Sequence, residues 1–233
     1  MKTIGIIGAM EEEISIFKSR LNIIATRNII DVDFYIGKLH ENNVVIARSG
    51  IGKVNAAACA QILIDKYGAE IIINVGVAGS LNPEVKIGDV VISTDTAYYD
   101  FDCSDIGDEI GLIPRMNRKF FPADENLVSK SFDAAKDVCI DKNVFRGRIV
   151  SGDRFVGKNS VKAQVLDIYP DALCCDMEGT AIGHVSFINK VPFVVIRSIS
   201  DTADDSAEVH FEQFVDEMAR NAAALVDNLI KSL

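Results

Sequence analysis

Short apolar runs alternate with helical segments along the whole sequence, and this alternation limits the possible folds more than any other feature. The runs are rich in β-branched residues and end in Gly, Ser or acidic residues, which is typical of strands buried on both faces of a parallel sheet. The run at 191–201 is the clearest example. The alternation predicts one α/β domain over 1–233, built of three layers, with a central mixed, largely parallel sheet flanked by helices.

The boundaries of the other elements follow from the same pattern. Further strands are expected at 2–8, 32–39, 44–49, 70–75, 89–100, 144–150 and 173–175. Helices are expected from 11, at 53–67, 124–140 and 160–168, from about 179 to 187, and at 211–229, where apolar residues recur at helical spacing. Residues 41–43 are expected to form a hairpin turn. The long acidic segment 101–118 is expected to be a lid or an interface arm.

Composition excludes several classes of function. A content of 48% hydrophobic residues in 233 suits one substantial core. The formal net charge of −10 argues against binding of nucleic acid or acidic membranes, and favours a small-molecule or protein partner. No apolar stretch reaches the roughly 18 residues of a membrane span. Five cysteines without a C-x-x-C pair predict reduced thiols in a cytoplasmic protein, and three scattered histidines predict no metal site.

Two glycine motifs superficially resemble nucleotide-binding loops, but neither has the required spacing. Gly5–Gly8 is not a dinucleotide fingerprint, and in Gly50–Lys53 the lysine is followed by Val54 instead of Ser or Thr. We expect Gly50–Lys53 to form a close backbone turn before a helix. A third small-residue segment, Gly76–Ser80, follows the strand expected at 70–75. It fits a tight turn and a close approach of a flat ligand equally well.

Acidic residues gather at the expected strand exits. Asp201 ends the run at 191–201, while Glu13 and Glu178 follow two other strands. Open α/β sheets bind ligands at this edge, so Asp201 is expected at the lip of a pocket. The alternatives are an N-cap role for Asp201 and a favourable helix-dipole interaction for Glu13. Phe155, at another exit, is either a core residue or a stacking partner for a planar ring. Such a set suits cleavage of a polar bond beside a flat ring.

Five motifs, taken together, carry a family resemblance. They are G-A-M-E-E-E at 8–13, S-G-I-G-K-V at 49–54, V-S-G-D at 150–153, D-M-E-G-T-A at 176–181 and S-I-S-D at 198–201. In this order and spacing the chain resembles, essentially end to end, the bacterial 5'-methylthioadenosine/S-adenosylhomocysteine nucleosidases of the nucleoside phosphorylase superfamily. The resemblance implies a nucleoside phosphorylase-like fold, a homodimer, no cofactor, and hydrolysis of both nucleosides to adenine and the 5-thioribose product. It adds 5'-deoxyadenosine as a candidate substrate.

The resemblance also implies residue roles. Asp201 would protonate purine N7, Glu13 would deprotonate the attacking water, and Glu178 would hold the ribose hydroxyls. Phe155 would stack on adenine and the backbone of Val156 would read its edge. The full set of expected substrate contacts is Met10, Ile51, Val77, Ala78, Gly79, Phe155, Val156, Met177, Ser200 and Phe211, together with the partner subunit's Ile106 and the partner subunit's Pro114. The chemistry agrees, because N-glycosidic cleavage builds negative charge on the base and positive charge on the sugar.

The chain departs from the family pattern at three positions. Many relatives have serine at Val77, where its hydroxyl helps to orient the purine-protonating acid, so this task would fall to Ser200 or water. Relatives often have Glu at Asp176 and Gly at Ser80. These differences affect the positioning of groups and leave the reaction unchanged.

Two other functions compete with hydrolysis. A purine nucleoside phosphorylase would use phosphate, but Asn74 stands where such relatives tend to have Arg, and Glu13 would repel an anion. A noncatalytic nucleoside-binding protein would not need to retain all three acids. The sequence leaves open the preferred 5'-substituent, among methylthio, homocysteinyl, deoxy and futalosine-type groups, and whether the 101–118 loop is ordered without substrate.

Overall fold

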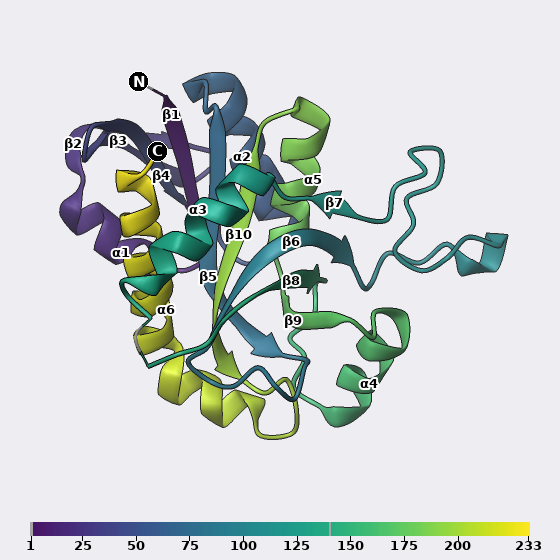
Figure 1. Cartoon of the computed structure of the whole chain (residues 1–233). Helices are drawn as coiled ribbons and strands as arrows, with labels where there is room; N and C mark the ends of the chain where they lie inside the picture. The colour runs from purple at the N-terminus through teal and green to yellow at the C-terminus, as the bar shows by residue number, and fades with distance from the viewer. Residues whose placement is uncertain (1, 140) are drawn as a thin grey trace.

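A twisted mixed sheet organises the fold, and helices cover both of its faces (Figure 1). The computed structural model describes residues 2–139 and 141–233. The strands are β1 (Thr3–Gly8), β2 (Asn22–Ile29), β3 (Val32–Leu39), β4 (Asn42–Arg48), β5 (Ile71–Ser80), β6 (Val90–Tyr98), β7 (Phe121–Pro122), β8 (Val144–Ser151), β9 (Ala172–Asp176) and β10 (Phe193–Asp201). The helices are α1 (Glu11–Arg20), α2 (Lys53–Tyr67), the 3-10 helix η1 (Ser104–Ile106), α3 (Glu125–Lys136), α4 (Asn159–Ile168), α5 (Gly179–Asn189) and α6 (Ala207–Lys231).

The predicted three-layer α/β architecture is confirmed. Helices α1, α3 and α6 pack together on one face of the sheet, and α2 packs with α5 on the other. Every residue of β5 and of β10 is buried, as expected for apolar strands covered on both faces. The long helix α6 packs against these two strands, and its predicted apolar stripe is buried from Met218 onward.

Five strands close into a ring that the sequence pattern did not predict. Along the sheet the order β10-β6-β8-β9-β5 is continuous, and β10 also pairs with β5. The pairs β1–β4, β1–β5, β5–β10, β6–β8 and β8–β9 are parallel, and the others in the described residues are antiparallel. The sheet is therefore mixed, with a closed barrel-like part and an open part formed by β1 to β4.

Strand β5 connects the two parts and leaves a gap on one edge. Its residues 71–74 pair with β1 and its residues 79–80 pair with β9, so the edge between them is not bonded to a strand. We expected a strand that ends at 75 and a turn at Gly76–Ser80, but the strand continues through this segment to Ser80. Val77 and Ala78, in the part of β5 between these two pairings, line the functional site described below.

The remaining differences concern element ends and two missed strands. Strands β2 and β7 were not predicted, and β4 begins at Asn42, so the hairpin turn lies at 40–41 instead of 41–43. The strand expected at 89–100 spans 90–98, and α3 ends at Lys136, whereas its expected end, residue 140, lies outside the described residues. The loop at 101–118 contains η1 and extends away from the body as an arm (Figure 1). No helix in the described ranges is long and apolar enough to cross a membrane.

Candidate active site

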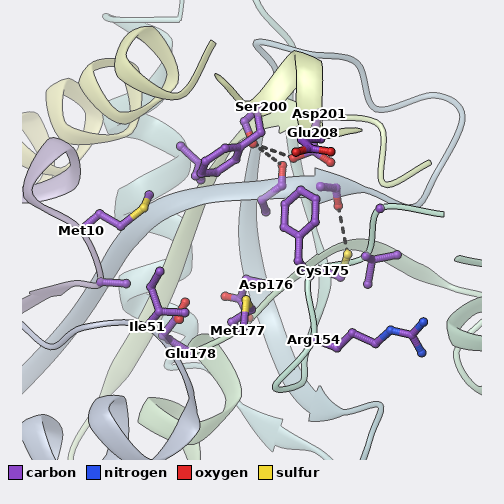
Figure 2. Close-up of a pocket in the computed structure, with 18 of the residues that line it drawn as sticks. Met10, Ile51, Arg154, Cys175, Asp176, Met177, Glu178, Ser200, Asp201 and Glu208 are labelled. Carbon is purple, nitrogen blue, oxygen red and sulfur yellow. Dashed lines mark hydrogen bonds between the residues drawn. The ribbon is translucent and has the colours of Figure 1, made fainter. Parts of the chain in front are cut away.

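A cavity of about 680 Å³ opens where β1, β5, β8, β9 and β10 end (Figure 2). Every substrate-contact and catalytic residue expected within one chain lines it: Met10, Glu13, Ile51, Val77, Ala78, Gly79, Phe155, Val156, Met177, Glu178, Ser200, Asp201 and Phe211. The sequence did not single out Arg154, Lys158, Cys175, Glu208 or Glu212, which also line it. Ile106 and Pro114 lie in the extended arm and do not line this cavity. The roles of all these residues stay predictions.

Asp201 is a buried carboxyl at one end of the cavity. Ser200 Oγ donates to its Oδ2 (2.9 Å) and the backbone N–H of Ala203 donates to its Oδ1 (2.9 Å). A Cβ added to Gly79 would lie 2.7 Å from Asp201 Oδ1, so glycine is needed beside this carboxyl. Burial raises the pKa of Asp201, and these hydrogen bonds oppose the shift. We call Ser200, Asp201, Ala203 and Gly79 the Asp201 cluster.

The alternative role of Asp201 as a helix N-cap is wrong. Helix α6 begins at Ala207, with five residues between it and the end of β10, and Ser206 occupies its N-cap position. Asp201 instead belongs to the last residue pair of β5 and β10, where the register shifts after Ile199. The carboxyl is thus fixed by the sheet itself, and it points toward the cavity rather than along a helix.

Glu13 occupies the gap on the edge of β5. Its Oε2 accepts from the backbone N–H groups of Ala9 (2.6 Å) and Met10 (3.0 Å), and its Oε1 accepts from that of Val77 (3.1 Å). A Cβ on Gly76 would overlap Glu13 Oε1, so only glycine allows this approach. Of the three adjacent glutamates, Glu13 alone is buried. It therefore has a specific position, beyond a general interaction with the helix dipole.

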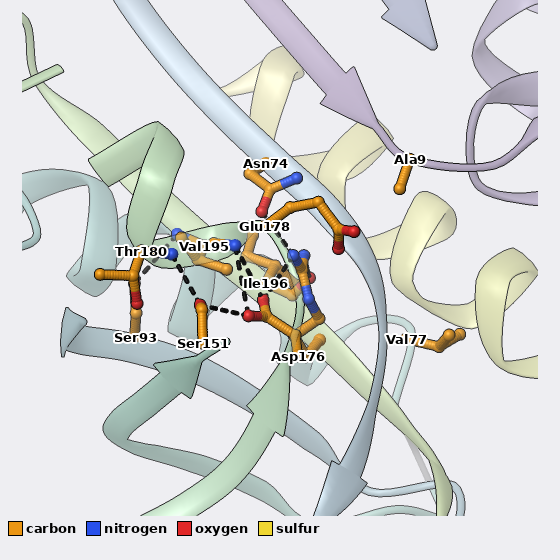
Figure 3. Close-up of polar contacts among 12 residues, drawn as sticks. Ala9, Asn74, Val77, Ser93, Ser151, Asp176, Glu178, Thr180, Val195 and Ile196 are labelled. Carbon is orange, nitrogen blue, oxygen red and sulfur yellow. Dashed lines mark hydrogen bonds and ion pairs between the residues drawn. The ribbon is translucent and has the colours of Figure 1, made fainter. Parts of the chain in front are cut away.

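A buried arginine lies beneath Glu13 and Glu178. Arg197 Nη2 contacts Asp176 Oδ2 (2.7 Å) and donates to Asn74 Oδ1, while Asn74 Nδ2 donates to the carbonyl of Ile7 (2.9 Å). Asp176 also accepts from Ser151 Oγ, and Ser151 Oγ accepts from the backbone N–H of Thr180 (Figure 3). We call Glu13, Asn74, Asp176, Glu178 and Arg197 the Arg197 cluster. One guanidinium here faces three carboxyl groups.

Glu178 is held by the start of α2. The backbone N–H of Gly52 donates to Glu178 Oε1 (2.8 Å), and Gly52 has φ +99°, a conformation that favours glycine. The expected turn at Gly50–Lys53 is therefore present and supports a pocket residue. Burial, with a smaller contribution from the nearby Asp176, raises the pKa of Glu178 to about 8, against the opposing effects of Gly52 and Arg197. Burial likewise raises the pKa of Glu13, against the charge of Arg197.

Aromatic and apolar side chains form the remaining walls. The side chain of Phe155 is 45% exposed, so its alternative role as a core residue is wrong. Its ring meets that of Phe211 edge-to-face, with centroids 5.8 Å apart. Val77 packs with Met218 and Ala219 of α6. Between Phe155 and the small residues of β5, the cavity offers a flat apolar space suited to a planar ring.

Sequence reasoning missed Arg197 and Asn74 as parts of the site. Arg197 lies within an apolar strand, and a charged residue there is itself a signal, because a buried charge requires partners. Asn74 has the same signal in β5. No group of three or more His, Cys, Asp or Glu that could hold a metal ion occurs in the part of the chain that the structure describes.

The two clusters place carboxyl groups in different surroundings at the two ends of the cavity. One end has a buried carboxyl with a raised pKa, suited to donating a proton to a leaving group. The other end has carboxyl groups next to a buried cation, suited to binding hydroxyls and accepting a proton from water. This arrangement fits cleavage of a bond between a planar heterocycle and a polyhydroxylated ring.

Comparisons with known proteins agree with this geometry. Residues 3–231 match the model of the phosphorylase superfamily. The chain is 40% identical to a 5'-methylthioadenosine/S-adenosylhomocysteine nucleosidase of Staphylococcus epidermidis, over 99% of this chain and 100% of that protein. It resembles the crystal structure of such a nucleosidase from Neisseria meningitidis in complex with methylthio-immucillin-A, with TM-score 0.96, 36% identity and full coverage of both chains. A nucleosidase of Colwellia psychrerythraea in complex with adenine gives TM-score 0.96 and 35% identity, over 100% of this chain and 96% of that one.

Proposed function

The chain belongs to the phosphorylase superfamily and, within it, to the 5'-methylthioadenosine/S-adenosylhomocysteine nucleosidases, and from this premise we propose the reaction that its pocket performs. It hydrolyses the N-glycosidic bond of both nucleosides and releases adenine and the 5-thioribose product. The observation that carries the proposal is the division of one cavity between a buried Asp201 with a raised pKa and the carboxyl groups that surround Arg197.

At the base end, Asp201 delivers its proton to N7 of the purine. The C1'–N9 bond breaks with its electrons moving into the ring, and protonation at N7 makes adenine a neutral leaving group. Ser200 Oγ fixes the carboxyl through Oδ2, in place of the hydroxyl that many relatives carry at Val77. Phe155 covers the face of the base and the backbone at Val156 lies at its edge.

At the sugar end, positive charge develops on C1' and O4' as the bond breaks. Glu178 binds the ribose hydroxyls, and Glu13 takes a proton from the water whose oxygen bonds to C1'. In their ionised forms, which Arg197 favours, both groups stabilise the developing cation electrostatically. Arg197 lies on the protein side of these groups and favours their ionised forms, because it lowers the pKa of each.

We further propose where the 5'-thioether substituent of the substrate binds and how a homodimer closes that part of the cavity. Met10, Ile51 and Phe211 line an apolar side of the cavity that suits a thioether substituent. Ile106, on the extended arm, is 76% exposed. In a homodimer the arm would close the tail side of the neighbouring site with the partner subunit's Ile106 and the partner subunit's Pro114. The five free cysteines support a reducing cytoplasmic location.

Hydrolysis is favoured over phosphorolysis by the charge around the water site. Arg197 is already engaged by Asp176 and Asn74, and Glu13 fills the gap on β5 with negative charge. The other cations that line the cavity, Arg154 and Lys158, lie on its exposed rim. A phosphate ion would need several converging donors at C1', and this pocket presents carboxyl groups there.

The test is release of adenine in phosphate-free buffer. We expect 5'-methylthioadenosine to yield free adenine and methylthioribose, with no further increase when phosphate is added. Adenine that appears only with phosphate would show a phosphorylase. Substrate that binds without turnover under either condition would show a noncatalytic binding protein.

A further inference from the structure

Three residues that the proposed chemistry does not use form a closed ring of contacts beside the pocket. Lys53 Nζ donates to both carboxylate oxygens of Asp100 (2.7 and 2.7 Å). The backbone N–H of Asp153 donates to Asp100 Oδ2 (2.8 Å), and the backbone N–H of Lys53 donates to Asp153 Oδ1 (2.8 Å). Lys53 Nζ also lies 3.7 Å from Asp153 Oδ2. We call Lys53, Asp100 and Asp153 the Lys53 ring.

The ring ties together three segments that are distant in sequence. Lys53 starts α2, Asp100 follows β6, and Asp153 follows β8. The segments are packed closely, because a Cβ on Gly152 would lie 2.5 Å from the ring of Tyr99 and 2.9 Å from Asp100 Cγ. The hydroxyl of Tyr99 also donates to the carbonyl of Arg154 (2.6 Å). Each segment is therefore held in place by the other two.

Two of these segments continue directly into the pocket. Gly52, whose N–H holds Glu178, precedes Lys53, and Phe155 follows Asp153 by two residues. We propose that the Lys53 ring is a positioning device that fixes Glu178 and Phe155 relative to each other, so that one substrate is held by its sugar and its base together. The proposal rests on the proposed function for the identity of that substrate. It gives the lysine of the Gly50–Lys53 motif a task other than binding phosphate.

The ring is expected to act on substrate binding more than on the chemical step. The hydrogen bonds to Asp201 come from Ser200 and Ala203, and those to Glu13 come from Ala9, Met10 and Val77, all outside the ring. Side chains of the ring are 24% to 49% exposed, and an isolated ion pair of such exposure contributes little to stability. Because the ring contacts neither Asp201 nor Glu13 and adds little stability, its loss should mainly raise KM.

Lys53→Met tests the proposal. We expect KM for 5'-methylthioadenosine to rise about tenfold, with kcat changed by less than about threefold, since the lost contacts position the residues that bind substrate. The melting temperature should shift by no more than about 4 °C. Lys53→Arg should recover most of the loss, because a guanidinium can bind both oxygens of Asp100. The control is Lys136→Met, which removes a lysine from an exposed pair with Asp133 (2.6 Å) and should change neither constant.

Coupling between ring members gives a second test. Asp100→Asn should raise KM to a similar extent, and the double variant with Lys53→Met should be hardly worse than either single variant, because both break the same ring. Fully additive effects would overturn the ring as a unit. A loss of kcat together with a large drop in melting temperature, not recovered by Lys53→Arg, would reduce it to a structural contact.

Calorimetric titration with adenine separates this inference from the proposed reaction. Adenine needs Phe155 but no turnover, and we expect Lys53→Met to weaken its binding about fivefold while Lys136→Met leaves it unchanged. A wild-type protein that binds adenine but releases none from nucleosides would overturn the proposed reaction alone. An active wild type, with KM and adenine affinity unchanged in Lys53→Met, would overturn the role of the ring alone.

Discussion

The two ends of the cavity hold buried carboxyl groups in different ways. Asp201 receives one hydroxyl and one amide, and none of the ion pairs in the described ranges includes it. The ammonium of Lys162 donates to the carbonyls of Ser80 (2.8 Å) and Thr202 (2.7 Å) and makes no ion pair with Asp201. In the Arg197 cluster, a buried guanidinium faces Glu13, Asp176 and Glu178.

This difference is the basis on which we propose one carboxyl group as the acid and another as the base. Burial raises the pKa of Asp201, Glu13 and Glu178 alike, because each loses water around its charged form. Only the sugar end has a buried cation that opposes this shift. Arg197 lowers the pKa of Glu13 and of Glu178 from what burial alone would give, although the pKa of Glu178 still stands at about 8. No buried cation opposes burial at Asp201, which fits its proposed role as the proton donor.

The largest expected effect comes from removing the lone acid. Asp201→Asn should lower kcat by roughly 10²–10⁴-fold, the usual contribution of a general acid, while adenine still binds. Steady-state kinetics and calorimetry with adenine measure the two quantities. Asp204→Asn is the matched control, because Asp204 lies outside the cavity and its carboxyl is bound by Ser206. Turnover that survives in Asp201→Asn would remove Asp201 from the chemistry.

The pH dependence of stability tests the sugar end. A carboxyl with a raised folded-state pKa stabilises the protein only while protonated, so stability falls as pH rises through the window between the unfolded and folded values. For Glu178 this window runs from 4.5 to about 8. The melting temperature of the ligand-free protein should fall on the order of 5 °C between these limits. Glu178→Gln should flatten the slope, and an unchanged slope would contradict the raised pKa.

The smallest expected effect concerns the orientation of Asp201. Ser200→Ala removes the hydroxyl that favours the charged form of Asp201, so the pKa of Asp201 should rise. Because Asp201 acts protonated, the alkaline limb of the kcat profile should move to higher pH, by less than about one unit, and kcat should fall about threefold to tenfold. Ser206→Ala, which removes an exposed hydroxyl, should leave the limb in place. A limb that moves equally in both variants would refute the orienting role of Ser200.

Strand exits were the part of the site that the sequence predicted well. Runs such as 191–201 end visibly where polar residues begin, and parallel packing brings such ends to one edge. For this reason Glu13, Glu178 and Asp201 could be grouped before their distances were known. The order and spacing of the five short motifs then indicated the family, and the family resemblance implied the reaction.

Features that depend on pairing across the chain could not be predicted. Strand β2 is mostly exposed and polar at Arg27 and Asn28, so it has no alternating pattern, and its pairing with β3 determines its conformation. The ring of five strands depends on which edges of β5 and β10 are bonded. Likewise, Arg197 and Asn74 are 123 positions apart. Local sequence indicates that each needs a partner but not which one.

The closed ring of strands has a consequence for how such a site diverges during evolution. Asp201 ends a strand that is bonded to β5 and β6, and Ala78 and Gly79 lie in the neighbouring strand, so insertions there would break paired backbone. Ile51 lies in a turn and Phe211 on a helix, and strand pairing holds neither residue. If Ile51 and Phe211 contact the 5'-substituent as we propose, that side of the cavity can diverge by substitution, while the strand ends that carry Asp201 and Gly79 stay constrained by their pairing.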